Sequence, residues 1–205
     1  MDLVIGFILG ILGSLLSWWA IARYLGPKVV ISKSITVVPT DLHAWGRPQR
    51  FKVLNKRRRG ISEVRAVARL RIKGLEAASL IYPNSRLAFE ISLSSVDNCV
   101  DYIRGRDGWI FTLDPQQITS PYTVFLPTSI KEALAARTAS MRDFLTLGDR
   151  AELEVFVSAT DGYSGTRRTF SHTYLIDDIV QGYFSVESLE VVEANSDDPP
   201  PRKGH

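Results

Sequence analysis

A chain of 205 residues is long enough for one domain with short attachments. Hydrophobic residues make up 45% of it and charged residues 23%, and these ordinary globular values exclude a chain that is disordered throughout. The single cysteine, Cys99, excludes an internal disulfide and a cysteine-based zinc site, and a net charge of +3 does not by itself indicate nucleic-acid binding.

The chain begins with an uncharged apolar segment. Leu3 to Ala22 reads LVIGFILGILGSLLSWWAIA, and its 20 residues would span about 30 Å as a helix, the thickness of a bilayer's hydrocarbon core. The segment has no polar face, and Trp18 and Trp19 near its end are residues that anchor at membrane interfaces. A cleaved signal peptide begins with basic residues, whereas the only charge here is Asp2. We therefore predict one transmembrane α-helix over residues 1–25.

The charges that flank this segment predict its orientation. Asp2 precedes it, and Arg23, Lys28 and Lys33 follow it. The positive-inside rule then places the N-terminus outside and the C-terminal domain in the cytoplasm, at the plasma (inner) membrane. A reducing cytoplasm also suits the unpaired Cys99.

Small residues recur along the same segment at a spacing of three or four. Gly6 and Gly10 form a GxxxG motif, and Gly13 and Ser17 repeat that spacing along much the same stripe. Such a stripe lets helix backbones approach closely and favours self-association in the membrane. Glycine is also common in transmembrane helices without any partner, so both interpretations stay open.

From Val29 onward the hydrophobic pattern has a period of two, which indicates half-buried strands. The clearest case follows Gly60, where apolar residues at 64, 66, 68, 70 and 72 alternate with the basic residues Arg65, Arg69, Arg71 and Lys73. Weaker alternation predicts further strands near residues 29–37, 87–93, 109–113, 122–126 and 153–159. Turn residues at 161–165 predict a hairpin into a strand over 167–175.

One helical segment is predicted over residues 129–147. Ser129 and Glu132 have capping-box spacing at its start, and Ser140 with Asp143 marks the start of a second short helix. Many short strands joined by turns favour an antiparallel β-sandwich. The predicted organisation is a helix over 1–25, a juxtamembrane linker with the first strands over 26–50, the sandwich over 51–193 and a disordered tail over 194–205.

Two stretches carry a family resemblance. Residues 51–74 read FKVLNKRRRGISEVRAVARLRIKG, an F-x-V-x-N strand, a basic turn and an alternating strand, and residues 159–184 read ATDGYSGTRRTFSHTYLIDDIVQGYF. In the second stretch the matching positions, in order, are Ser164-Gly165, Thr173-Tyr174, Asp177-Asp178-Ile179, Gly182 and Phe184. Both resemble the cytoplasmic domain of inward-rectifier potassium channels. Gln181 departs from the family, which has tryptophan before the late glycine.

The resemblance implies an immunoglobulin-like β-sandwich that assembles as a tetramer below a membrane. The family binds anionic lipid through basic residues after its last transmembrane helix, and the matching positions here are Arg23, Lys28 and Lys33. This chain has one predicted transmembrane helix where the channels have two, and its sequence lacks a TVGYG-like filter. Selective potassium conduction is therefore not implied.

Residues 47–59 hold the strongest charge cluster, seven basic residues without an acid. Within it the run Lys56, Arg57, Arg58 and Arg59 falls in a predicted turn and suits an anionic lipid or a phosphorylated ligand, with nucleic acid less favoured. The alternative is an ordinary solvated turn. The basic stripe that follows Gly60 either pairs with Glu152 and Glu154 at a subunit interface or forms an exposed sheet face, which we favour slightly.

Residues typical of catalysis do not form a recognisable set. The sequence holds no GxSxG, Walker A, HExxH or CxxC motif, and Asp177 and Asp178 point to opposite faces of an extended chain. We interpret His172 as a partly buried, hydrogen-bonded residue and Cys99 as a small apolar one. No enzyme activity, cofactor or metal is expected.

These observations favour a single-pass, membrane-anchored cytoplasmic binding or sensor domain. It would self-associate through the glycine stripe and recognise an anionic ligand, a lipid or a partner protein. The alternative function is an oligomeric, channel-like pore or a membrane-disrupting effector, in which four such helices assemble around a lining of Gly and Ser.

Overall fold

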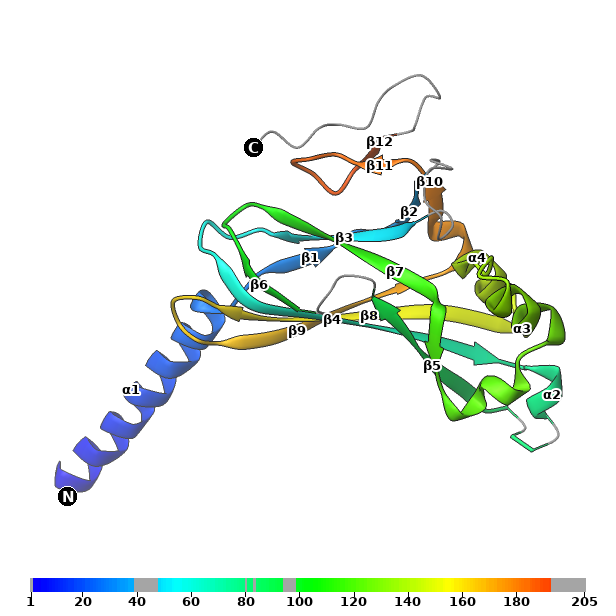
Figure 1. The fold of residues 1–205 in the computed structure, drawn as a ribbon. Helices are drawn as coiled ribbons and strands as arrows, with labels where there is room; N and C mark the ends of the chain where they lie inside the picture. Colours follow the sequence, from blue (N-terminus) through cyan, green and yellow to red (C-terminus); the bar gives the residue numbers. More distant parts are fainter. Residues whose placement is uncertain (1, 39–47, 80, 83, 94–98, 193–205) are drawn as a thin grey trace.

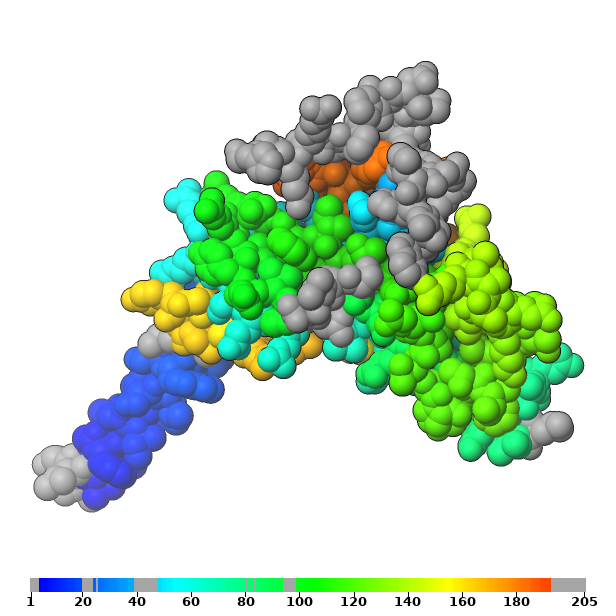
Figure 2. Space-filling model, in the orientation of Figure 1, coloured from blue at the N-terminus to red at the C-terminus, as the bar shows by residue number. Residues whose placement is uncertain are grey.

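The computed structural model describes residues 2–38, 48–79, 81–82, 84–93 and 99–192. The helix α1 (Asp2–Leu25) leads into a mainly β body and projects from it (Figures 1 and 2). The predicted N-terminal helix is therefore confirmed as a helix. The predicted tail over 194–205 lies outside the described residues, as does the part of the predicted linker over 39–47.

Ten strands form one curled sheet, in the order β10-β2-β3-β7-β5-β4-β8-β9, with β1 added beside β3 and β6 beside β4. Their bounds are β1 (Val29–Ile31), β2 (Ile35–Val37), β3 (Gln49–Asn55), β4 (Ile61–Lys73), β5 (Arg86–Leu93), β6 (Cys99–Ile103), β7 (Gly108–Thr119), β8 (Arg150–Asp161), β9 (Arg167–Tyr174) and β10 (Ile179–Gln181). Within the described residues its pairs are antiparallel, except that β10 runs parallel to β2.

The long strand β4 organises the sheet. It pairs with β8 along its length, with β5 along its second half and with β6 along its first half. A register shift between Ser62 and Arg65, with Glu63 at a φ of 49°, marks a bulge that bends the strand. The two halves of β4 thereby pair with different neighbours, which fits the curl of the sheet (Figure 1).

One hydrophobic core fills the inside of the curl. The predicted alternation of β4 is confirmed, because its apolar residues Val64, Ala66, Ala68, Leu70 and Ile72 are all 0% exposed. Phe51 of β3 stacks on Phe111 of β7 at 5.3 Å between ring centroids. Tyr174 at the end of β9 is fully buried and donates a hydrogen bond of 2.8 Å to the Ser32 carbonyl, which ties β9 to the connection between β1 and β2.

Arginine residues of β4 and β5 pair with acids on the same chain. Arg71 lies 2.9 Å from Glu154 of β8, and Arg86 of β5 lies 3.1 Å from Glu152. The Arg71–Glu154 pair joins the neighbouring strands β4 and β8, whereas Arg86 reaches Glu152 across β4, which lies between β5 and β8. Of the predicted stripe, Arg71 pairs with Glu154 within one subunit, whereas Glu152 pairs with Arg86 and Arg150 instead. These contacts give no support for a subunit interface.

One strand predicted in the middle of the chain is wrong. Residues 122–126 form a 3-10 helix (Pro121–Phe125), because Pro121 lacks a donor for a strand ladder and the Ser120 hydroxyl accepts from the Tyr122 amide at 3.1 Å. The helical segment predicted over 129–147, with a second short helix starting at Ser140, is present as α3 (Thr128–Ala135) and α4 (Met141–Leu145).

The break between α3 and α4 has a local cause. Arg137 adopts a left-handed conformation with a φ of 56° and ends α3, and Ser140 with Asp143 forms the predicted capping box that starts α4. The proposed cap at Ser129 does not form, since α3 begins one residue earlier without a side-chain cap. A further short helix, α2 (Glu76–Ser79), follows β4.

The last described segment is a small hairpin of β11 (Tyr183–Phe184) and β12 (Val191–Val192). Lys52 of β3 is 3% exposed and reaches the connection between these strands. Its ammonium donates to the carbonyls of Ser185, Val186 and Ser188 at 2.6, 2.8 and 2.9 Å. This lysine therefore fastens the hairpin to the sheet.

Helix α1 is exposed along its described length. Its side chains are described at residues 4–19 and 24, and the large apolar ones among them are 45–69% exposed. Over the part of the chain that the structure describes, no helix has both the length and the apolar character required to cross a membrane.

Candidate functional site

The predicted basic turn lies beside the end of α1. The chain passes from the helix through buried Gly26 and Pro27 to exposed Lys28. The backbone amide of Lys56 donates to the carbonyl of Lys28 at 2.9 Å. The turn between β3 and β4 therefore stands at the end of the sheet from which α1 projects (Figure 1).

A second basic turn, residues 104–107 between β6 and β7, packs against the first. The Arg106 amide donates to the Arg57 carbonyl at 2.7 Å. A Cβ atom added at Gly105 would collide with the Arg58 carbonyl, so the close approach of the two backbones requires glycine there.

Asn55, at the end of β3, holds the two turns together. Its side chain is completely buried, and its amide donates to the carbonyls of Arg59 at 2.7 Å and Arg104 at 3.2 Å. Its side-chain oxygen accepts from the Arg57 amide at 3.0 Å. Because each turn hydrogen-bonds to the same buried side chain, their relative position is fixed.

We call this surface the basic end. Six of its basic residues are exposed and Arg57 is half-buried; the set comprises Lys28, Lys56, Arg57, Arg58, Arg59, Arg104 and Arg106. The Nε atom of Arg57 is buried and has no hydrogen-bond partner in the structure. Asp107 is the acidic residue of the second turn. The arrangement concentrates positive charge on exposed loops, which suits the binding of anionic groups.

The turn between β8 and β9 adds an anchored aromatic residue to the basic end. Asp161 is 1% exposed and accepts from the amides of Tyr163 and Ser164 at 3.1 and 2.8 Å. Burial raises the pKa of Asp161, but these hydrogen bonds, the Ser164 hydroxyl and the charge of Arg59 outweigh it and leave the pKa below its usual value. The Arg59 guanidinium lies 4.6 Å from the centroid of the Tyr163 ring, which is 76% exposed.

The structure therefore brings Lys28 together with the predicted run from Lys56 to Arg59. The side chain of Arg23 lies outside the described residues, and Lys33 follows β1 at the other end of that strand. Arg104 and Arg106 were missed, because they are about fifty positions from the first cluster. The signal that could have found them is the R-G-R-D turn between two alternating segments.

The glycine stripe of α1 is open. Apart from the adjacent backbone of the helix itself, no atom of the described residues lies within 4 Å of a Cβ built at Gly6, Gly10 or Gly13. The Ser14 hydroxyl donates to the Gly10 carbonyl of the same helix at 2.9 Å, and Ser17 is exposed. Self-association through Gly6, Gly10, Gly13 and Ser17 stays a prediction.

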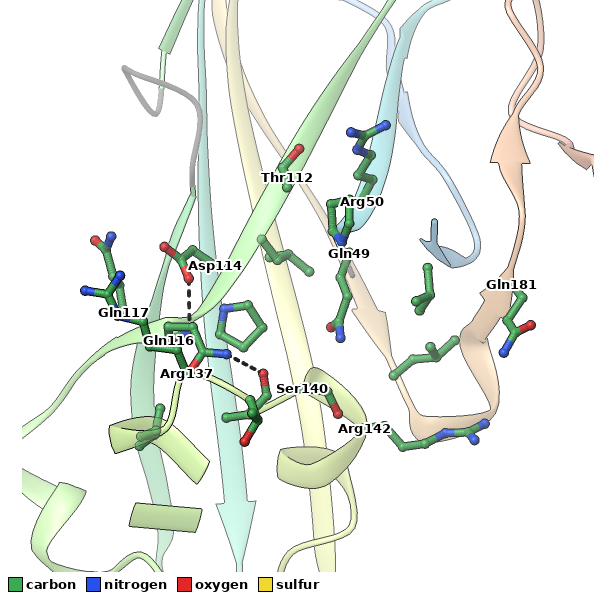
Figure 3. A pocket seen from close by; sticks show the side chains of 18 residues that line it. Gln49, Arg50, Thr112, Asp114, Gln116, Gln117, Arg137, Ser140, Arg142 and Gln181 are labelled. Carbon is green, nitrogen blue, oxygen red and sulfur yellow. Dashed lines mark hydrogen bonds between the residues drawn. The ribbon is translucent and has the colours of Figure 1, made fainter. Parts of the chain in front are cut away.

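A pocket of about 950 Å³, which the sequence did not reveal, lies at the opposite end of β3 (Figure 3). Its walls come from the start of β3, the middle of β7, the connection between α3 and α4, and β10. Three arginine side chains line it, Arg50 from β3, Arg137 from the connection after α3 and Arg142 from α4, and Asp114 is the acid among the lining residues.

Glutamine side chains fix the walls of this pocket. Gln49 accepts from the Met141 amide at 3.0 Å, and Gln116 donates to the Ala139 carbonyl at 2.7 Å. Asp114 accepts from the Gln116 amide at 3.0 Å. The segment between α3 and α4 is thus held to the sheet by contacts between residues up to 92 positions apart, which no local pattern could predict.

The residues considered for catalysis are dispersed. His172 is half-buried with its ring edge-on to Tyr174 at 4.6 Å, and Cys99 is a half-buried free thiol. Within the described residues, His, Cys, Asp and Glu form no group of three that could hold a metal ion. No protein-family model and no curated protein matches the chain.

Proposed function

We propose that this protein is a membrane-anchored binding domain whose basic end contacts anionic lipid headgroups at the inner surface of the membrane. The observation that carries the proposal is the backbone hydrogen bond of 2.9 Å from Lys56 to Lys28. It places the basic end beside the helix that would hold the protein at the membrane, so both elements would meet the same surface.

Helix α1 supports the anchor. Phe7, Leu16 and Trp18 are 68, 66 and 69% exposed, and the printed sequence is uncharged from Leu3 to Ala22. Burial of one such side chain in an apolar phase is worth about 1.5–3 kcal/mol. A row of them in water would be strongly unfavourable, and a lipid phase removes that cost.

Charge and aromatic residues support the lipid contact. Each Lys or Arg near an anionic leaflet contributes about 1 kcal/mol, and the basic end offers seven. Tyr24, Tyr102 and Tyr163 are 69, 56 and 76% exposed on α1, β6 and the turn after β8. Tyrosine is enriched at membrane–water interfaces, where its ring meets lipid and its hydroxyl meets water.

The resemblance to inward-rectifier cytoplasmic domains points the same way. In this proposal the curled sheet is an immunoglobulin-like sandwich, the N-terminus lies outside and the sheet lies in the cytoplasm. The protein forms a homo-oligomer, a tetramer by resemblance, through the stripe of Gly6, Gly10, Gly13 and Ser17. Binding at the basic end would then alter helix association.

The anchor and the lipid contact are tested separately. Alkaline carbonate extraction of membranes that contain the full chain should leave it in the pellet, and recovery in the supernatant would contradict the anchor. Hydrogen exchange in nanodiscs should show that phosphatidylserine protects the backbone amides of residues 56–59 and 104–106, compared with phosphatidylcholine alone.

A charge-matched pair of variants makes the lipid test specific. Replacing Lys56, Arg57, Arg58 and Arg59 by Ser should abolish the phosphatidylserine-dependent protection of residues 104–106. The control replaces Arg65, Arg69, Lys73 and Lys131 by Ser, which removes the same charge elsewhere on the protein. Equal protection in both variants would show that the basic end is ordinary surface.

A further inference from the structure

We propose that the pocket at the start of β3 binds a small, soluble organic phosphate. Its volume of about 950 Å³ lies at the upper end of the range of small-molecule sites, and it accommodates a ligand of nucleotide size. The pocket shares no residue with the basic end, so this inference does not depend on lipid binding.

Charge gives the class of ligand. Arg50 lies on β3, Arg137 follows α3 and Arg142 lies on α4, while Asp114 is the acid among the lining residues. The net charge of the charged lining side chains is therefore three minus one, or +2. Guanidinium groups from three segments suit an anion with several oxygens, because each presents a planar fork of donors to phosphate or carboxylate.

The rest of the wall indicates that the ligand has a body as well as a charge. Apolar side chains of Val37, Leu113, Leu134 and Ile179 line part of the pocket. Gln117 and Gln181 lie on its walls and carry both donors and acceptors. A purely inorganic anion would leave this apolar and amide surface unused, whereas a phosphate ester of a flat, polar ring would use all of it.

Two buried polar atoms at the wall still lack a hydrogen-bond partner in the structure, Arg50 Nε and Gln116 Oε1. Unsatisfied buried groups cost about 1–3 kcal/mol each, and native proteins keep few of them. Small side-chain movements around a bound ligand, or a water that comes with it, would satisfy both atoms. Their presence in a charged pocket supports a binding site over an incidental gap.

The position of the pocket favours a soluble ligand over a lipid headgroup. On this stretch of chain the basic end begins at Lys56 and the pocket includes Arg50, so six steps of extended chain separate them by about 20 Å. A headgroup of the bilayer that meets the basic end would not reach that far. The phosphate would therefore arrive from the aqueous phase.

Isothermal titration of the full chain in phosphatidylcholine nanodiscs tests the proposal with AMP, inorganic pyrophosphate and adenosine as probes. We expect AMP to bind most tightly, pyrophosphate more weakly and adenosine not measurably. Vesicles with phosphorylated phosphatidylinositol supply the lipid source of the same chemistry. Competition of AMP by these vesicles would overturn the choice of a soluble ligand, and absence of binding by AMP and pyrophosphate at millimolar concentration would overturn the site.

Two variants separate loss of the site from loss of the fold. Arg137→Gly removes one guanidinium at a φ of 56°, a conformation that glycine adopts without strain, so this variant should fold at least as well as the wild type. Arg142→Gln removes an exposed one. Each should weaken AMP binding about tenfold or more, since charge-assisted hydrogen bonds are lost.

The matched controls decide what a loss means. Lys131→Gln removes one charge from α3 outside the pocket and should leave AMP binding unchanged. The variant with four serines at residues 56–59 should also bind AMP normally, even where its lipid contact is gone. Undiminished AMP binding by both Arg137→Gly and Arg142→Gln would contradict the assignment of this pocket.

Discussion

Lys52 is the residue whose replacement should separate the C-terminal hairpin from the rest of the fold. Its ammonium is the shared donor to three carbonyls of the connection between β11 and β12, at 2.6, 2.8 and 2.9 Å. Lys52→Met keeps most of the apolar stem in its buried place on β3 and removes only the donors. The expected effect is local, because the core strands do not depend on these contacts.

The magnitude follows from two opposing terms. A hydrogen bond from a charged donor contributes about 1.5–3 kcal/mol, so three such bonds set an upper bound of about 4.5–9 kcal/mol. Burial lowers the pKa of Lys52 and the charge of Asp107 counteracts this, so dehydration of the ammonium offsets part of the gain. The released carbonyls also regain water. We expect the opening free energy of the hairpin to fall by about 2–3 kcal/mol.

Hydrogen exchange of the full chain measures this directly. A loss of about 2–3 kcal/mol corresponds to exchange about 30- to 150-fold faster for amides of residues 183–192. Amides of β4 and β8 should exchange at the wild-type rate. The reasoning fails if the hairpin of Lys52→Met exchanges as slowly as the wild type, or if β4 and β8 lose protection to the same extent.

Three further substitutions test contacts described above. Asn55→Ala should destabilise the protein by about 2–4 kcal/mol and speed exchange in residues 56–59 and 104–107, since it removes the buried amide that donates to the carbonyls of Arg59 and Arg104. Urea unfolding and hydrogen exchange measure this, and a destabilisation below about 0.5 kcal/mol, less than one hydrogen bond contributes, would contradict it. Asp161→Asn should cost about 1 kcal/mol at pH 7. Because the folded pKa of Asp161 is depressed, the wild type loses its advantage as the pH falls from the unfolded value of 3.8 through the folded pKa, and a constant difference between pH 7 and pH 3 would refute the pKa direction. Burial raises the pKa of Tyr174, while the hydrogen bond to Ser32 opposes this rise and the charge of Asp178 adds to it. Above pH 10.0 the tyrosine therefore ionises first in the unfolded chain, and the stability of the fold decreases. Tyr174→Phe should reduce this decrease and should cost about 1 kcal/mol at pH 7, as measured by thermal unfolding.

The strands were the most predictable part of the fold. Strict alternation marks β4, because its apolar face at residues 64–72 is completely buried, and Arg71 on its other face pairs with Glu154 of β8. The curl of the sheet was not predictable, because it depends on how β5, β6 and β8 share β4. The Ser140 cap predicted where α4 begins, but no sequence signal predicted the left-handed Arg137 that ends α3.

The two candidate sites also differ in how far the sequence predicts them. The first basic turn could be predicted because Lys56 to Arg59 are consecutive, whereas its partner turn depends on the buried amide of Asn55. The pocket could not be predicted at all. Arg50, Asp114 and Arg142 come from separate segments, and each read alone is an ordinary charged residue of a strand or a helix. Only the tertiary contacts of Gln49 and Gln116 bring them to one wall.

Strand β3 has a further consequence for how the protein could transmit a signal. It is hydrogen-bonded to β1, β2 and β7, so it cannot slide by one residue without turning Phe51 and Val53 out of the core. A displacement of Arg50 along β3 would therefore displace Asn55 as well. Ligand binding in the pocket and the position of the basic turns beside α1 would then change together.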